Sequence, residues 1–121
     1  MARILIVDDD VSMLSFLSAA LKRSNHEVIT EENGQKALDI LMNDNNFDLI
    51  LSDVIMPGMD GIELSQKVAK ILPKLKIMFI TGFSAVALGD KNPHKTGNQV
   101  ISKPFHLGDL VERVNEMLAK D

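Results

Sequence analysis

The stretch ILIVDDD, residues 4–10, joins a short aliphatic run directly to three aspartates. A continuous, β-branched run of this length favours a strand that is covered on both faces, as in a parallel sheet, over a strand with one face in water. We expect the strand to end at Asp8, where the run changes to acids. Because ligand sites in open α/β sheets form beyond the carboxyl ends of the strands, these acids are the first candidates for a functional site.

The rest of the chain repeats this unit of a strand followed by a helix. Short apolar runs predict further strands over residues 26–30, 47–52, 75–80 and 100–101. Apolar residues at helical spacing predict helices over residues 11–23, 34–42, 62–72 and 107–119. Parallel strands need crossover connections, and right-handed crossovers place helices on both faces of a sheet. We therefore expect a single doubly wound α/β domain, with Phe16 and Phe47 in its core.

The composition excludes several classes of protein. The 121 residues, 45% apolar and 25% charged, are typical of one globular domain, and the absence of cysteine excludes disulfides, thiolate nucleophiles and sulfur-ligated metals. A net charge of −4 without Trp or Tyr lacks the basic stripe and the stacking residues of nucleic-acid binding. No apolar run approaches the ~20 residues that span a bilayer, and the first residues do not fit a signal peptide. We expect a cytoplasmic protein with no membrane or nucleic-acid partner.

The predicted strands bring polar side chains to one edge of the sheet: Asp8, Asp9, Asp53, Thr81 and Lys103. Two carboxylates about 4 Å apart repel by about 4 kcal/mol at an effective dielectric constant near 20, so the acids need a cation. An all-oxygen ligand set that leaves room for water and phosphate favours Mg²⁺. With the ion and Lys103 absorbing charge and Thr81 donating its hydroxyl, the Asp53 carboxylate could attack phosphorus and form an acyl phosphate.

The motifs around these residues resemble the receiver domain of two-component response regulators, a family that includes CheY. They are VDD at residues 7–9, Asp53 followed by MPGMDG at 56–61, FITG at 79–82 and SKPF at 102–105. The resemblance covers nearly the whole chain, and it implies a flavodoxin-like or CheY-like sheet of five strands in the order 2-1-3-4-5. Residues 1–121 would then form one receiver domain without an output domain.

The same resemblance implies a role for each acid at the edge of the sheet. Asp53 would be the phosphoacceptor. Asp9 and Asp53 would bind Mg²⁺ directly, together with the backbone carbonyl of Ile55, and Asp8 would act mostly through water.

Thr81 and Lys103 would hold the phosphoryl oxygens, and the peptide between Lys103 and Pro104 would be cis. The phosphoryl donor would be the phosphohistidine of a histidine kinase or a histidine phosphotransferase. Such a protein is a signalling switch, phosphorylated only on its own aspartate, that passes its message by changing its contacts with another protein.

Residues 79–88 and 102–107 resemble a narrower group, the CpdR-type single-domain regulators. These control substrate delivery to the ClpXP protease and are generally inhibited by phosphorylation. The resemblance implies that ClpXP or its substrates are downstream partners. A CheY-like regulator, or a phosphorelay intermediate with another protein target, is the alternative.

The sequence departs from the family in two places. Most receivers have Tyr or Phe three residues before the lysine, where the ring reports the state of the threonine, and here the residue is Val100. Residues 89–97, GDKNPHKTG, contain Pro93, which costs a helix roughly 3 kcal/mol. We expect a short or irregular fourth helix there, either a tolerant loop or a segment that orders when a partner binds.

Two functions of other classes remain as alternatives. One is a Mg²⁺-dependent phosphatase, although the haloacid-dehalogenase type has a second acid two residues after its nucleophile, where this chain has Ile55. The other is a binding module that never uses its acids. If the chain is a receiver, Ile55 and Phe83 are candidates to cover the path of the water that hydrolyses the acyl phosphate.

Overall fold

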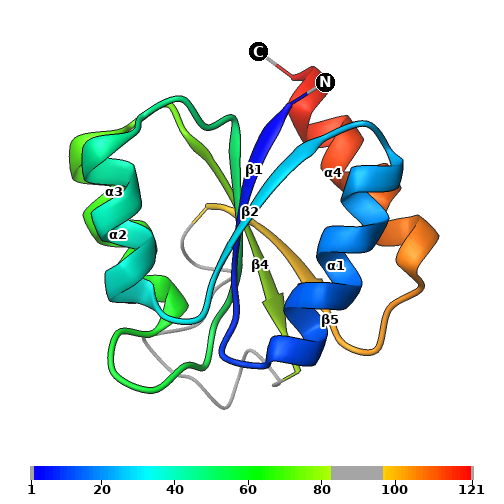
Figure 1. Ribbon diagram of the computed structural model, residues 1–121, viewed down its shortest axis with the longest axis horizontal. Coiled ribbons are helices and arrows are strands. Elements are labelled where there is room, and N and C mark those ends of the chain that lie inside the picture. Colours follow the sequence, from blue (N-terminus) through cyan, green and yellow to red (C-terminus); the bar gives the residue numbers. More distant parts are fainter. Residues whose placement is uncertain (1, 83–96, 121) are drawn as a thin grey trace.

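The computed structural model describes residues 2–82 and 97–120, which form one parallel sheet between two layers of helices (Figure 1). The strands are β1 (Arg3–Val7), β2 (Glu27–Glu31), β3 (Leu49–Asp53), β4 (Lys76–Thr81) and β5 (Gln99–Ser102). The helices are α1 (Val11–Arg23), α2 (Gly34–Asn43), α3 (Gly61–Ile71) and α4 (Leu107–Ala119). None of these helices is long and apolar enough to cross a membrane.

The strand order β2-β1-β3-β4-β5, with every neighbouring pair parallel, confirms the predicted fold. Each predicted strand and helix is present, with ends within about two residues of the expected ones. The irregular segment expected over residues 89–97 lies outside the described residues except for Gly97, and so does Phe83.

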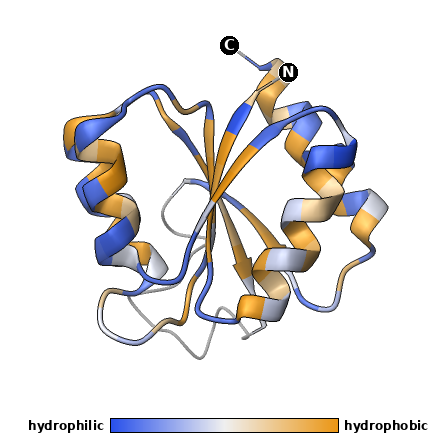
Figure 2. Ribbon diagram, viewed as in Figure 1, coloured by the Kyte–Doolittle hydropathy of each residue, from blue (hydrophilic) through white to orange (hydrophobic). Residues whose placement is uncertain are grey.

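Helices cover both faces of the sheet, α1 and α4 on one side and α2 and α3 on the other (Figure 1). Successive residues of β1 therefore enter different cores: Ile4 and Ile6 pack with the α1 and α4 side chains, and Leu5 and Val7 with those of α2 and α3. All four are at most 1% exposed. This two-sided burial explains why the middle strands, such as β1 and β4, carry continuous apolar runs, which are orange in Figure 2.

Polar side chains directly before α1, α2 and α3 cap the first turns of these helices. The carboxylate of Asp10 accepts hydrogen bonds from the first-turn amides of α1, and Asn33 and Asp60 cap α2 and α3 in the same way. Each cap fixes the loop between a strand end and the next helix. The third aspartate of the opening motif is thus structural, while the first two remain available for a site.

Phe16 is a correction to the expected core, since its side chain is 52% exposed. The buried face of α1 is formed by Leu14, Leu17 and Leu21. One residue turns a helix by 100°, so Phe16 is rotated off this face although it belongs to the same apolar run. Phe47, at 8% exposed, is buried as expected.

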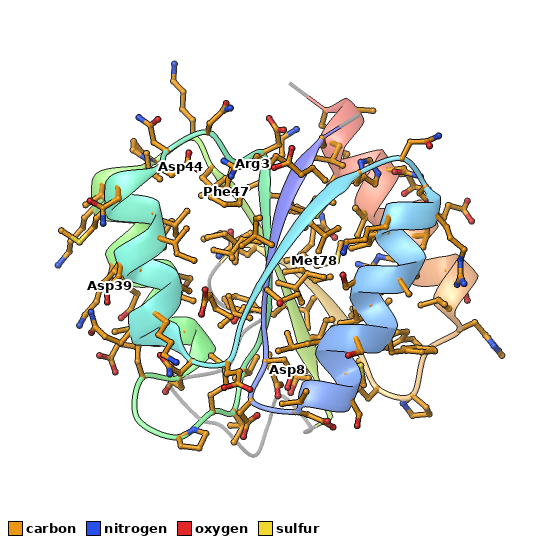
Figure 3. All side chains as sticks on the ribbon, in the orientation of Figure 1. Arg3, Asp8, Asp39, Asp44, Phe47 and Met78 are labelled. Carbon is orange, nitrogen blue, oxygen red and sulfur yellow. The ribbon has the colours of Figure 1, made fainter. Side chains whose placement is uncertain are left out.

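At the opposite edge of the sheet from Asp8, Arg3 joins three segments of the chain (Figure 3). Its guanidinium forms ion pairs with Glu27 at 2.7 Å and Asp44 at 2.6 Å, and it lies 4.3 Å from the centre of the Phe47 ring. The ion pair holds the pKa of Asp44 below its usual value. At the amino-terminal edge of the sheet, Glu27 and Asp44 are therefore both paired with Arg3.

Candidate functional site

The carboxyl-terminal edge of the sheet carries all five predicted side chains. Asp8 and Asp9 follow β1, Asp53 ends β3, Thr81 ends β4 and Lys103 follows β5. These four strands are adjacent and parallel, so their last residues form a single row.

Asp8, Asp9 and Asp53 form a compact carboxylate cluster, with one oxygen from each residue within 4.8 Å of the others. Asp8 is only 1% exposed. Its Oδ1 atom accepts a hydrogen bond of 2.8 Å from the Asp10 amide, but its Oδ2 atom has no hydrogen-bond partner among the described residues. Burying an unsatisfied oxygen costs about 1–3 kcal/mol, and more when the group is charged. A hard cation between the carboxylates would supply the missing partner, so the residues fit a Mg²⁺ site.

The pKa shifts of Asp8 and Asp53 indicate the same lack of positive charge near the cluster. Burial, aided by the nearby charge of Asp53 and opposed by the hydrogen bond from the Asp10 amide, raises the pKa of Asp8 to about 6. Burial also raises the pKa of Asp53, while the Lys103 ammonium and the Val54 amide oppose that rise. A divalent cation would reverse this balance and favour ionised carboxylates.

The two oxygens of Asp53 have different surroundings. Its Oδ1 atom accepts a hydrogen bond of 2.8 Å from the Val54 amide. Its Oδ2 atom lies 4.0 Å from Lys103 Nζ, and the side chains of Asp53 and Lys103 are 12% and 30% exposed. Thus Oδ1 is held by the backbone, and Oδ2 faces the lysine.

Thr81 and Lys103 are joined through the backbone, because the Lys103 amide donates a hydrogen bond of 2.7 Å to the Thr81 carbonyl. Thr81 is 1% exposed and lies one residue beyond Ile80, the residue of β4 that is in register with Asp53. The Lys103–Pro104 peptide is cis, as the family resemblance implies.

The backbone of Asp53 has two contacts that the sequence analysis missed. The Ser52 hydroxyl donates a hydrogen bond of 2.8 Å to the Asp53 carbonyl. Gly61, the first residue of α3, lies so close that a Cβ atom there would be 2.1 Å from the same carbonyl oxygen. The only signals in the sequence were a serine at the end of an aliphatic strand and a glycine at the end of a turn motif.

Ile55 and Val100 lie beside the site. Ile55 is 42% exposed, and its amide helps to stabilise the charged form of Asp53, whereas metal binding by its carbonyl remains a prediction. Val100 packs against the core beneath α2 and α3, where most receivers are expected to have an aromatic ring.

Comparison with known proteins agrees with this geometry. The family model of the response regulator receiver domain matches residues 4–115. The response regulator receiver protein CpdR of Brucella abortus is 47% identical over 118 residues, covering 98% of both chains.

Solved structures agree with these matches. A CheY-like response regulator receiver domain protein from Methanospirillum hungatei superposes with a TM-score of 0.88 at 31% identity, covering 98% of this chain and 94% of that one. The response regulator TrrA of Thermotoga maritima, solved in complex with Mg²⁺-BeF, gives 0.85 at 30% identity over 97% and 99% of the two chains. With its sheet order, its acidic edge and these matches, the chain belongs to the receiver domain family of two-component response regulators.

Proposed function

We propose that Asp53 accepts a phosphoryl group from the phosphohistidine of a histidine kinase or histidine phosphotransferase. Asp8, Asp9, Asp53 and the carbonyl of Ile55 would hold the Mg²⁺ that the reaction needs. The observation that carries the proposal is the carboxylate cluster next to the ammonium of Lys103, in which the Oδ2 atom of buried Asp8 has no hydrogen-bond partner in the part of the chain that the structure describes.

In this reaction Oδ2 of Asp53 is the nucleophile, because Oδ1 is engaged by the Val54 amide. A lone pair of Oδ2 forms the new O–P bond as the P–N bond to the donor imidazole breaks. The electron pair of the P–N bond returns to that nitrogen, and because the other ring nitrogen of the phosphohistidine carries a proton, a neutral imidazole leaves. When bound, Mg²⁺ supplies positive charge that offsets the repulsion between the carboxylates and the incoming phosphoryl oxygens. The Lys103 ammonium pairs with one phosphoryl oxygen and the Thr81 hydroxyl donates to another.

Phosphorylation changes the charge around Lys103. The phosphoryl group adds about −1.5 to −2 charges within reach of this ammonium, which then has a stronger partner than the carboxylate 4.0 Å away. Lys103 connects β5 to the loop before α4, so its shift alters the adjacent surface. The signal passes through the contacts that this surface makes with another protein.

For the downstream target, we propose regulated proteolysis through a ClpXP-type protease in the cytoplasm. The support is the resemblance of the two loops around Thr81 and Lys103 to CpdR-type regulators, together with the identity to CpdR over nearly both full chains. Pull-down of protease components with wild type and Asp53→Ala tests this target. Capture that differs between the unphosphorylated and phosphorylated forms is expected, and no capture by any form would instead favour another target.

Phosphorylation is tested by incubating the protein with acetyl phosphate and Mg²⁺ and measuring the intact mass. We expect one base-labile phosphoryl adduct in wild type, and none in Asp53→Asn. Asp39→Asn, at an exposed acid of α2, is the matched control and is expected to form the adduct. Repeated release of phosphate without an adduct would point to a phosphatase, and an inert protein would point to a binding module.

A further inference from the structure

Ser52 is a buried hydroxyl residue at a position where packing alone favours an apolar side chain. It is 1% exposed. Ile50, two residues earlier on the same face of β3, belongs to the core beneath α2 and α3. Val7 and Phe79, which are in register with Ser52 on the neighbouring strands, belong to the same core. A hydroxyl among these side chains is costly unless it has a hydrogen-bond partner.

The partner of the hydroxyl is the backbone of the phosphoacceptor. Ser52 Oγ donates a hydrogen bond of 2.8 Å to the Asp53 carbonyl oxygen. This carbonyl and the Val54 amide belong to one planar peptide unit. The Val54 amide donates to Oδ1 of Asp53 at 2.8 Å and to the Ile80 carbonyl of β4 at 3.2 Å. The peptide unit between Asp53 and Val54 is therefore held at both of its ends.

This peptide unit orients the Asp53 carboxylate. Because the Val54 amide holds Oδ1, a tilt of the unit would turn the carboxylate and move Oδ2 relative to Lys103 Nζ, which lies 4.0 Å away. A Cβ atom at Gly61 would lie 2.1 Å from the carbonyl oxygen of the unit. The backbone of α3 thus limits the movement of this oxygen by contact, and the Ser52 hydroxyl limits it by attraction.

We propose that Ser52 is a positioning residue for phosphoryl transfer. Through the peptide unit between Asp53 and Val54, its hydroxyl holds the carboxylate in the orientation in which Oδ2 can attack phosphorus. The effect passes through the backbone and needs no contact between Ser52 and the phosphoryl group. The inference rests on the proposed function, since it concerns Asp53 as the nucleophile.

The first test measures the rate of phosphorylation of Ser52→Ala. Wild type and variant are incubated with Mg²⁺ and several concentrations of acetyl phosphate, and the phosphoryl adduct is followed by intact mass. A displacement of about 1 Å can slow such a reaction about 100-fold, and a tilt of one peptide unit is smaller. We expect the maximal rate to fall about five- to tenfold and the apparent KM for acetyl phosphate to change less than about twofold, because aim is lost and donor binding is kept. Ser52→Thr keeps the hydroxyl and should recover most of the lost rate.

Ser65→Ala is the matched control. Ser65 is also buried, at 5% exposed, and its hydroxyl donates a hydrogen bond of 2.7 Å to the Ile62 carbonyl within α3. Its replacement therefore removes the same kind of bond without touching the peptide unit after Asp53. We expect Ser65→Ala to be phosphorylated within about twofold of the wild-type rate. Denaturant unfolding of both variants shows whether their stabilities are comparable.

The second test needs no phosphoryl donor. Amide hydrogen exchange of Val54 is measured by NMR relative to that of Leu51, which is buried in the middle of β3. In Ser52→Ala we expect Val54 to exchange about tenfold faster relative to Leu51, and in Ser65→Ala we expect the ratio to stay unchanged. A hydroxyl that only stabilised the fold would change the exchange of both amides alike, since both would report the same loss of global stability.

Equal maximal rates for Ser52→Ala and Ser65→Ala would overturn the proposal. So would a Ser52→Thr protein as slow as Ser52→Ala, or a ratio of Val54 to Leu51 exchange that Ser52→Ala leaves unchanged. A wild-type protein that takes up no phosphoryl group would overturn the proposed function itself. The exchange of Val54 would then still show whether Ser52 holds the peptide unit, so the two failures are distinguishable.

Discussion

The contact between Gly61 and the Asp53 carbonyl gives a prediction that links folding to the site. An alanine at Gly61 would place its Cβ atom 2.1 Å from that oxygen and 3.0 Å from Val54 Cα. Both obstacles are backbone atoms, so neither can turn aside as a flexible side chain would. Overpacking usually costs about 1–3 kcal/mol, and this site belongs at the upper end of that range. Since replacing glycine in a helix gains up to about 1 kcal/mol, we expect a net loss of roughly 2 kcal/mol in unfolding free energy.

Denaturant unfolding of Gly61→Ala measures this loss, with Gly108→Ala as the matched control. Gly108 also lies in the first turn of a helix, but a Cβ atom there would have nothing within 4 Å, so its replacement should be neutral or stabilising. Because α3 can relieve the clash only by displacing Asp53 or moving away itself, phosphorylation of Gly61→Ala should also slow by about 10- to 100-fold. A Gly61→Ala protein as stable as the Gly108→Ala control would refute the reasoning.

Three further variants test charges at the two edges of the sheet. Asp8 has a pKa raised to about 6 by burial, so the folded state binds its proton more tightly than the unfolded state and the contribution of Asp8 to stability falls as pH rises from about 4 to 6. Without Mg²⁺ at pH 7, Asp8→Asn should therefore be more stable than wild type by up to about 3 kcal/mol, and equal denaturation midpoints would contradict this. Lys103→Met removes the ammonium that lowers the pKa of Asp53, so this pKa, followed by carboxyl NMR, should rise, while phosphoryl uptake falls. The Nζ atom of Lys76 donates hydrogen bonds to the carbonyls of Met117 and Lys120 at the end of α4, so Lys76→Met should lose about 1 kcal/mol of unfolding free energy. The control is Lys67→Met, which breaks only an exposed ion pair with Glu63 and should lose less than about 0.5 kcal/mol.

The sequence predicted those features that depend on local pattern. Aliphatic runs that end in acids or hydroxyls identified the strands and placed Asp8, Asp53 and Thr81 at one edge, because parallel strands share that edge. The motif resemblance supplied the strand order and the cis peptide before Pro104, neither of which follows from periodicity.

Features that depend on distance in space could not be predicted in this way. An apolar residue one position off the buried face of a helix looks the same in sequence as a core residue, and for that reason Phe16 was assigned wrongly. The close approach of Gly61 to the carbonyl of Asp53 depends on how α3 packs against the end of β3. The contacts of Arg3 with Glu27 and Asp44 join segments far apart in the chain, so no local sequence pattern predicts them.

The pKa of an aspartate carboxyl group is shifted in opposite directions at the two edges of the sheet. Asp44 at the amino-terminal edge is paired with Arg3, and the pKa of Asp44 is lowered. Asp8 at the carboxyl-terminal edge is buried, its Oδ2 atom has no hydrogen-bond partner among residues 2–82 and 97–120, and its pKa is raised. Asp44 has an arginine partner, whereas the more deeply buried Asp8 has none. The charged form of Asp8 therefore destabilises the fold unless a ligand binds beside it. This contrast within one chain is the physical reason to propose cation binding at the Asp8 edge rather than at the Arg3 edge.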